Sequence, residues 1–195
     1  AEALAKFENA GTYEIEVSAF GKTTLLTVTV TNYTFEGVTA ADVNAVYDGT
    51  AKVPTLNNAP AGVTVVWTYY EGENAEGEAL ESAPVNAGTY YAQGVVSLKY
   101  YNDTTVTANV VIEKQTFDVT KLTWNKPVKM YTGSAINANV TATNLPEGVT
   151  FTYEGVGKTG TAVGAYIVTV KFNDANSTNY KMSAETCDVE WQIIA

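Results

Sequence analysis

Asn86-Ala87-Gly88-Thr89-Tyr90 is a stretch that this chain uses more than once. An identical copy stands at Asn9-Ala10-Gly11-Thr12-Tyr13, and a weaker copy stands at Ala162-Val163-Gly164-Ala165-Tyr166. An alternating run rich in β-branched residues follows each tyrosine, and the three glycines are 77 and 76 residues apart. Self-similarity at a fixed period is the signature of a repeat array. The sequence therefore predicts tandem units, each with a glycine–tyrosine turn that opens a strand.

Two further landmarks set the bounds of the units. A Tyr-x-Gly turn and a Gly-Val-Thr strand each occur twice, at Tyr47-Asp48-Gly49-Thr50 and Tyr131-Thr132-Gly133-Ser134, and at Pro60-Ala61-Gly62-Val63-Thr64 and Pro146-Glu147-Gly148-Val149-Thr150. These matches predict one β repeat over residues 34–114 and a second over residues 115–195. The first of these is longer because of an extra Glu-rich stretch, residues 71–85, for which the natural place is a surface loop.

The first 33 residues predict only the closing strands of a truncated repeat. Two Val/Leu/Thr-rich segments, 7–17 and 23–30, flank the tight turn Phe20-Gly21-Lys22, which is a hairpin pattern. An isolated hairpin is marginally stable in water. We therefore expect residues 1–33 to be the C-terminal strands of a unit whose first half would lie upstream.

Almost every segment has a hydrophobic period of two, which is the period of a strand. The only helical candidate is the short stretch 39–44. Six or seven short strands in about 80 residues, separated by Gly- and Pro-containing turns, favour an all-β fold of small Ig-like β-sandwich or β-grasp-like repeats. The connectors at 31–34 and 113–116 are short, so we expect the repeats to be arranged as a rod.

The glycine–tyrosine stretch has a physical reason in such folds. In Ig-like sandwiches a tyrosine near the start of a late strand buries its ring at a corner while its hydroxyl bonds to nearby backbone. A preceding glycine permits the close turn. The predicted structural corners are Gly11 with Tyr13, Gly88 with Tyr90, and Gly164 with Tyr166.

The composition argues against several classes of function. Of the 195 residues, 21 are acidic and 11 are basic, which gives a net charge of −10, and all eleven basic residues are lysine. This negative field repels nucleic acid and anionic membrane surfaces. Histidine is absent, which removes imidazole bases and His-ligated metals. The sequence predicts no catalytic, cofactor-binding or metal-binding residues, no enzyme activity, and no membrane insertion within this segment.

Some residues can be interpreted either as functional or as purely structural. The five glutamates of residues 71–81 could coordinate Ca²⁺, but their spacing and two glycines favour a solvated loop. In the tyrosine pairs 69–70 and 100–101, adjacent side chains point to opposite faces of a sheet. Tyr69 and Tyr101 are therefore candidate glycan contacts, although a half-buried sheet position is the simpler interpretation. The three tryptophans, and the single Cys187, favour packing roles.

Several of these elements together resemble a known family. Tyr47-Asp48-Gly49, Pro60-x-Gly62-Val63, the stretch 86–90, Phe172-Asn173-Asp174 and Asn179-Tyr180 resemble the MBG and YDG-type repeats of large bacterial surface proteins and adhesins. The resemblance covers both full units and the tail of the third. It departs from the pattern in the last unit, where Thr132 replaces the aspartate and Val163 replaces the alanine, which puts in doubt any role of that aspartate.

The resemblance implies exported, tandem, non-enzymatic β modules that project other domains from a cell. The leading expectation is thus a structural or adhesive repeat module of a bacterial cell-surface protein, located extracellularly and acting as a stalk or spacer. Its partners would be neighbouring repeats of the same chain, and a host glycan or surface protein. Two alternatives stay open: a lectin-like domain that binds host glycan or mucin, and a strand-donating assembly subunit whose incomplete first unit offers open edges.

Overall fold

The computed structural model describes Phe7 and residues 9–195; the other residues of the predicted tail 1–33, which are 1–6 and 8, lie outside the described part. The described residues form β-strands joined by loops and single 3-10 turns, and no α-helix occurs among them. The all-β expectation is confirmed. The helical candidate at 39–44 is wrong, because this stretch forms the short strand β3 (Thr39–Ala40) and the start of β4 (Val43–Val46).

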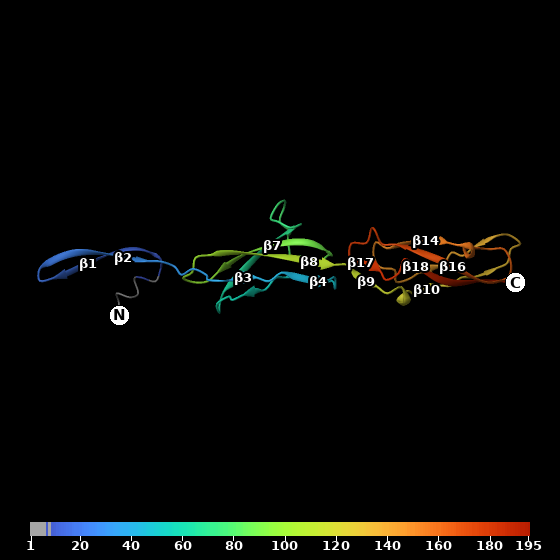
Figure 1. The fold of residues 1–195 in the computed structure, drawn as a ribbon, viewed down its shortest axis with the longest axis horizontal. Helices are drawn as coiled ribbons and strands as arrows, with labels where there is room; N and C mark the ends of the chain where they lie inside the picture. Colours follow the sequence, from blue (N-terminus) through green and yellow to red (C-terminus); the bar gives the residue numbers. More distant parts are fainter. Residues whose placement is uncertain (1–6, 8) are drawn as a thin grey trace. The chain divides into compact units, whose positions relative to one another are not determined.

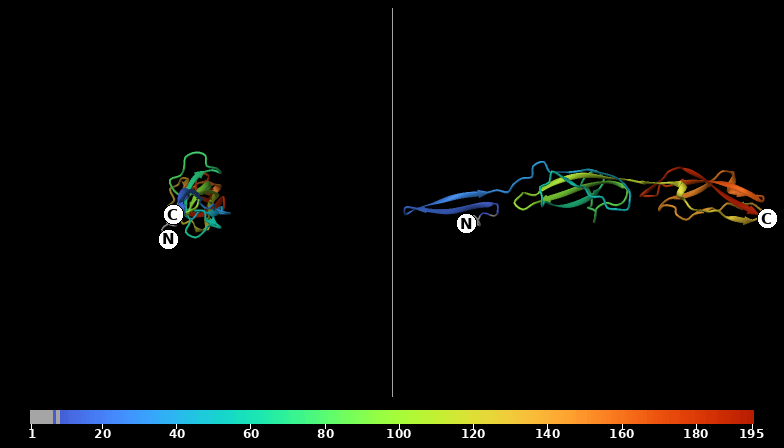
Figure 2. Two further views of the ribbon diagram at one scale, coloured as in Figure 1. Left: turned by 90° about the vertical axis from the view of Figure 1, so that its left-hand side faces the viewer. Right: turned by 90° about the horizontal axis from the view of Figure 1, so that it is seen from below.

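The expected N-terminal hairpin is confirmed. Strands β1 (Gly11–Ala19) and β2 (Lys22–Val30) pair antiparallel with Ala19 opposite Lys22. The turn residues Phe20 and Gly21 have φ angles of 50° and 74°, as a two-residue hairpin turn requires. Figure 2 shows the two strands, in blue, as a ribbon of their own, and they form a two-stranded sheet. Some of its apolar residues, such as Leu25 and Leu26, are exposed.

The first full repeat, here called repeat one, is built on one four-stranded sheet of order β4-β8-β7-β6. The bounds of its remaining strands are β5 (Leu56–Asn57), β6 (Thr64–Glu71), β7 (Gly88–Ser97) and β8 (Thr104–Glu113). Strands β3 and β5 form a separate two-stranded ladder. On β8 the buried residues alternate with exposed ones, so that Val106, Ala108, Val110 and Ile112 lie on the inner face.

The last unit, here called repeat two, has a four-stranded sheet of order β11-β18-β16-β14. Its elements are β9 (Gln115–Phe117), η2 (Val119–Lys121), β10 (Trp124–Asn125), β11 (Val128–Met130), β12 (Ile136–Asn137), β13 (Thr141–Ala142), β14 (Thr150–Glu154), η3 (Val156–Lys158), β15 (Thr159–Gly160), β16 (Gly164–Asn173), β17 (Tyr180–Met182) and β18 (Thr186–Ile194). The corresponding strands of the two repeats therefore have the same order in their sheets. The sequence repeat is therefore a repeat of topology.

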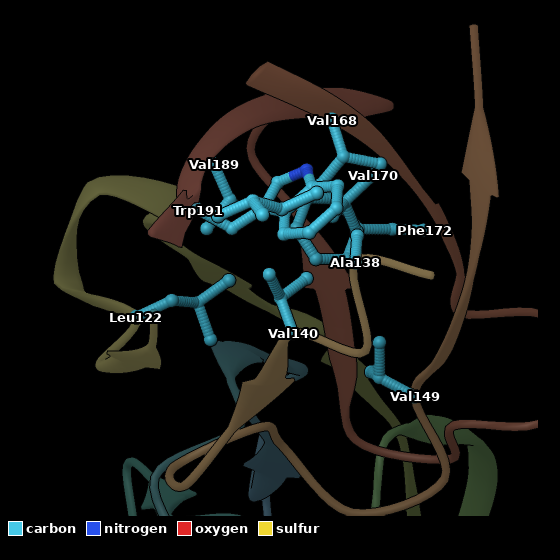
Figure 3. Close-up of a cluster of buried hydrophobic side chains, with 10 residues drawn as sticks. Leu122, Ala138, Val140, Val149, Val168, Val170, Phe172, Val189 and Trp191 are labelled. Carbon is cyan, nitrogen blue, oxygen red and sulfur yellow. The ribbon is translucent and has the colours of Figure 1, made fainter. Parts of the chain in front are cut away.

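The core of repeat two lies between this sheet and a second layer. Strands β16 and β18 supply the buried Val168, Val170 and Trp191. The segment before β14 supplies Leu122 and Val140, together with Ala138 and Val149. Figure 3 shows Leu122 and Val140 pointing toward the side chains on the sheet. Apolar surface buried between two layers is the usual way in which a small β domain is stabilised, and the expectation of tandem β-sandwich repeats is confirmed.

The Glu-rich stretch that repeat two lacks is a loop in repeat one. No strand occurs between β6, which ends at Glu71, and β7, which begins at Gly88. Gly72 and Gly77 have φ angles of 94° and 90°, a region that glycine enters without steric cost. Most of residues 71–82 are exposed.

The chain divides into two compact units whose borders cut through repeat one. The first unit contains the chain up to Val43, Lys52–Pro84 and Thr89–Val110. The second contains Asn44–Ala51, Val85–Gly88 and Val111–Ala195. Three short segments of repeat one, 44–51, 85–88 and 111–114, thus belong to the same compact unit as repeat two. The boundaries predicted from the sequence, 33/34 and 114/115, stay predictions. No helix in the described part of the chain has the length and apolar character needed to cross a membrane.

Candidate functional site

Each glycine–tyrosine stretch opens a strand. Gly11, Gly88 and Gly164 are the first residues of β1, β7 and β16. The hydroxyl of Tyr13 donates to the carbonyl oxygen of Asn9 at 2.8 Å, and the hydroxyl of Tyr166 donates to that of Ala162 at 2.7 Å. Both tyrosines therefore close a loop four residues upstream of themselves, in the manner expected for a tyrosine corner.

The third corner is in repeat one, where the ring of Tyr90 is buried and 8 % exposed. Burial raises the pKa of Tyr90, and the negative charge of Glu71 adds to this effect. Glu71 lies opposite Tyr90 in the pairing of β6 with β7. The corner tyrosine is thus held neutral at the edge of the core, because a buried phenolate would lose its hydration.

Repeat two reinforces its corner with a tryptophan. Trp191, opposite Tyr166 on β18, stacks on that ring with the centroids 4.9 Å apart. Its indole Nε1 donates to the carbonyl oxygen of Gly157 at 2.8 Å. Gly157 has no space for a side chain, because a Cβ atom there would lie 1.6 Å from the carbonyl oxygen of Ile167. The corner, the tryptophan and the η3 turn thus form one packed group.

The segment that links one repeat to the next is paired rather than free. After β8 the chain continues into β9, which pairs parallel with β17 of repeat two, so that Gln115 lies opposite Tyr180 (Figure 1). After β2 the chain makes the same kind of parallel contact, a bridge between Tyr33 and Tyr101. The amide of Tyr33 donates to the carbonyl oxygen of Tyr100 at 2.8 Å. Each linker is therefore bonded to the loop between the last two long strands of the repeat that follows.

Side-chain hydrogen bonds hold the linker between repeat one and repeat two in place. The backbone amide of Ala87 donates to Oδ1 of Asn179 at 2.8 Å, and Nδ2 of Asn179 donates to Oδ1 of Asn86 at 3.1 Å. The amide of Gln115 donates to the carbonyl oxygen of Asn179 at 2.8 Å. A single asparagine of repeat two thus bonds both to the corner of repeat one and to the linker.

Two more contacts complete the group. Nζ of Lys114 donates to the carbonyl oxygen of Ser177 at 2.6 Å. The ring of Tyr47 meets that of Tyr180 edge to face, with the centroids 5.5 Å apart, a geometry that the quadrupoles of the rings favour. We call this group of residues the inter-repeat joint: Tyr47, Asn86, Ala87 and Lys114 from repeat one, and Ser177, Asn179 and Tyr180 from repeat two.

The loop of repeat two is pre-organised for these contacts. Ser177 is 2 % exposed, and its hydroxyl donates to the carbonyl oxygen of Glu147 at 2.7 Å. Oδ2 of Asp174 accepts from the amide of Met182 at 2.8 Å. A polar groove of about 380 Å³, lined by Asn86, Glu147 and Asn179 among others, lies beside the joint. The loop therefore presents Asn179 from a fixed position, which lowers the entropic cost of the joint.

Sequence reasoning placed Asn179-Tyr180 in a family pattern but did not assign these residues to a contact between repeats. The partner of Asn179 is Ala87, which is 92 residues earlier in the chain. The stretch 86–88 has two roles. It opens the corner of repeat one, and it contacts the loop of repeat two. No local pattern can show the second use.

The candidate glycan contacts are placed differently from the expectation. Tyr69 is buried, with 5 % of its surface exposed, so the expectation that it contacts a glycan is corrected. The residues on the exposed face of β6 are others, such as Val66. Tyr101 is half-buried and stacks on Phe35 with the ring centroids 4.8 Å apart. The exposed tyrosines nearby are Tyr33 and Tyr100, which are 68 % and 43 % exposed.

The other candidate residues have packing or surface positions. Among the described residues, no group of three or more Cys, Asp or Glu side chains is close enough to hold a metal ion. Trp191 lies in the core of repeat two, and Trp124 packs against that core. Cys187 is half-buried in β18, and burial raises the pKa of its thiol, with a further contribution from Asp188.

The chain matches several solved structures at low sequence identity. They include immunoglobulin domains 1–5 of Sidekick-1, at 13 % identity and a TM-score of 0.23 over 95 % of this chain and 46 % of that one. Cadherin domains 1–5 of protocadherin gamma B2 match at 12 % identity and a TM-score of 0.27, over 96 % and 45 %. The protocadherin gamma B4 extracellular domain matches at 10 % identity and a TM-score of 0.24, over 100 % of this chain and 38 % of that one. The chain spans less than half the length of each.

At these TM-scores the chains do not superimpose as wholes, and a search of curated protein sequences finds no match. The comparison that assigns the chain is the one with family models. The model of the MBG domain matches twice in tandem, over residues 36–116 and residues 121–186. These two stretches correspond to repeat one and repeat two, and together they make up more than half of the chain. The chain belongs to the MBG domain family.

Proposed function

We propose that this chain is a structural repeat module of a bacterial cell-surface protein, in which it holds other parts of that protein at a distance from the cell. The observation that carries this proposal is the inter-repeat joint. A spacer transmits position and force only if each repeat is fixed to the next. Here Asn179 bonds to two residues of repeat one, and the linker itself is paired as a strand.

The mechanism of such a spacer is mechanical. A pull along the chain loads β18, β16 and the linkers, and unfolding requires the breaking of backbone ladders and the exposure of a packed core. The corner of repeat two adds a hydrogen bond where its long strand β16 begins. No chemistry on a substrate is needed for this role, and the negative charge of the chain, −10, keeps neighbouring copies apart in solution.

A distance measurement tests whether the repeats are fixed. Spin labels on cysteines introduced at Val66 and Ile167, which are both exposed strand positions, would be placed in a Cys187→Ser background. Pulsed electron paramagnetic resonance should give one narrow distance distribution. The control carries a glycine–serine insert after Lys114 and should give a broad one. If the unmodified linker gives the same broad distribution as the insert, the spacer function is rejected.

The location needs a separate test. Antibodies raised against this chain should label intact cells of the source bacterium, and mild protease treatment of those cells should remove the label. A cytoplasmic marker protein must stay protected under the same conditions. A signal that develops only after the cells are broken would contradict a position on the cell surface.

A second candidate function is saccharide binding at the first linker. Tyr33 and Tyr100, which are 68 % and 43 % exposed, line a pocket of about 540 Å³ together with Asn32. Aromatic faces with a nearby amide suit the apolar face and the hydroxyls of a sugar ring. A glycan array would separate the two functions, because a spacer gives no signal. Binding that is lost in Tyr33→Ala but kept in Tyr131→Ala would support the saccharide site.

A further inference from the structure

Strand β6 of repeat one has an edge that no other strand covers in the described part of the chain. It is the last strand of the sheet β4-β8-β7-β6 and pairs with β7 alone. Its eight residues, TVVWTYYE, carry no charge before Glu71, and Val66 is 70 % exposed. A long edge strand that is rich in β-branched and aromatic residues and free of proline is a template for pairing with another chain.

The register of β6 with β7 shows which backbone groups face this edge. Just after β6, the amide of Gly72 donates to the carbonyl oxygen of Thr89 at 2.9 Å. In an antiparallel ladder every second residue bonds to the partner strand. The even-numbered residues of β6 therefore bond to β7. The odd-numbered ones, among them Val65, Trp67 and Tyr69, direct their amides and carbonyl oxygens toward the edge.

The loop that follows β6 bonds to this edge. Residues 72–87, here called the Glu-rich loop, connect β6 to β7. The amide of Leu80 donates to the carbonyl oxygen of Tyr69 at 2.8 Å, which is one of the groups that face the edge. Further along the loop Pro84 is buried, and its carbonyl oxygen accepts from the amide of Lys52 at 2.9 Å. The second half of the loop is therefore anchored on repeat one.

The corresponding edge of repeat two is built differently. Strand β14 has five residues rather than eight, and it ends in Glu154, whose Oε1 lies 3.4 Å from Nζ of Lys171. The chain then turns into η3. A short edge strand that carries charged side chains discourages pairing by itself. The extra loop thus occurs in the repeat whose edge strand is long and apolar.

We infer that the Glu-rich loop is an edge cover, which keeps β6 from pairing with the β6 of a second copy of this chain. Antiparallel pairing of two such edges about a two-fold axis at Trp67 would place Val65 of one copy opposite Tyr69 of the other. The amide of Val65 would then donate to the carbonyl oxygen of Tyr69, which Leu80 occupies. The loop thus takes the position that the second strand would need.

The charges of the loop act in the same direction. Glu73, Glu76, Glu78 and Glu81 are exposed, and Glu71 ends the strand. Two copies that paired at β6 would bring both sets of carboxylates close together, and like charges repel. The edge cover therefore combines an occupied backbone acceptor with electrostatic repulsion.

Leu80→Pro tests the edge cover, because proline has no amide hydrogen and cannot donate to Tyr69. In sedimentation equilibrium, the weight-average mass of this variant should rise about twofold above that of the unmodified chain at equal concentration, as a two-fold dimer requires. Ala79→Pro, at the adjacent exposed position, is the control and should leave the mass unchanged. A folded Leu80→Pro variant with the mass of the unmodified chain, or an equal rise in Ala79→Pro, would overturn the inference.

Two lysine variants locate the contact. In the Leu80→Pro background, Val66→Lys should restore the mass of the unmodified chain, because lysine on an edge strand opposes strand addition. Val95→Lys is the matched control and should leave the dimer intact. Val95 is 42 % exposed and lies opposite Val66, but on the interior strand β7. A dimer that survives Val66→Lys would overturn the inference, because the contact would then lie elsewhere.

A measurement on the unmodified chain does not depend on the folding of any variant. Amide hydrogen exchange, followed by nuclear magnetic resonance, should be slower by about tenfold or more at Leu80 than at Glu78. Both residues belong to the Glu-rich loop, but the amide of Leu80 is bonded to β6. Equal exchange rates at the two amides would overturn the edge cover. The spacer function rests on the inter-repeat joint, so it stands under each of these outcomes.

Discussion

Asn179 of repeat two accepts a hydrogen bond from the backbone amide of Ala87 in repeat one, at 2.8 Å. The alanine belongs to the stretch that opens the corner strand β7, and the asparagine belongs to the loop that precedes β17. One short stretch therefore serves two purposes, the start of a strand within its own repeat and the reception of the next repeat. The stretch that most clearly recurs in the sequence, residues 86–90, is thus also the stretch that contacts the next repeat.

Asn179→Ala should loosen the inter-repeat joint without unfolding repeat two. The variant loses two hydrogen bonds, at about 1 kcal/mol each. Hydrogen exchange at the amide of Ala87 should accelerate, while the near-ultraviolet circular dichroism from Trp191 stays the same. Thr178→Ala, at the exposed neighbouring position, is the control and should change neither. Unchanged exchange at Ala87 would show that Asn179 does not hold the joint.

Gly157→Ala should unfold repeat two or destabilise it severely. The added methyl group would lie 1.6 Å from the carbonyl oxygen of Ile167, so β16 would have to move away from η3. We expect a loss of about 3 kcal/mol or more in the free energy of unfolding. Val156→Ala, at the adjacent exposed residue, should change it by less than about 0.5 kcal/mol. Urea denaturation, monitored by tryptophan fluorescence, gives the free energy of unfolding of both variants. Equal losses in the two variants would contradict the steric argument.

Tyr166→Phe should cost about 1 kcal/mol of the stability of repeat two. The substitution keeps the ring that stacks on Trp191 but removes the hydroxyl, which donates to the carbonyl oxygen of Ala162 and accepts from its amide. Tyr131→Phe, at an exposed tyrosine of the same repeat, should have almost no effect. Thermal unfolding of the two variants compares them directly, and an equal loss in both would exclude a special role for the corner hydroxyl.

The stability of the chain should fall at alkaline pH. Burial raises the pKa of Tyr69, Tyr90 and Tyr153 above the ordinary value of 10.0. The folded state then holds these protons more tightly than the unfolded state, so the contribution to stability is complete below pH 10 and is lost as the pH rises through the folded values. Urea midpoints measured across this range should decrease, and less steeply in Tyr69→Phe. A flat profile would contradict the burial of these hydroxyls.

Some of this fold could be derived from residues close together in the chain. Glycine, a β-branched run and a turn act over a few residues, and they predicted the strand starts at Gly88 and Gly164 and the hairpin turn at Phe20-Gly21. The stretch 39–44 was only a candidate helix within an all-β prediction, and it forms strand because its helical spacing is too brief to compete with pairing to other strands. Tertiary contacts override weak local preference of this kind.

The face that a strand residue occupies could not be derived in this way. Alternation shows that Tyr69 and Tyr70 point to opposite faces, but the side on which the second layer packs determines that Tyr69 is the buried one. The same limit applies to Gly157, since the requirement for glycine comes from the backbone of Ile167 in another strand. Such requirements become visible only when the layers are assembled.

The amino-acid sequence by itself determined that the chain is an all-β tandem array with glycine–tyrosine corners, because repeat period and strand alternation are properties of neighbouring residues. Only the tertiary structure decided that Asn179 meets Ala87 and that Lys114 meets Ser177. The physical reason is that these contacts join residues far apart in the chain, and their geometry is fixed by sheet register and packing rather than by local propensity.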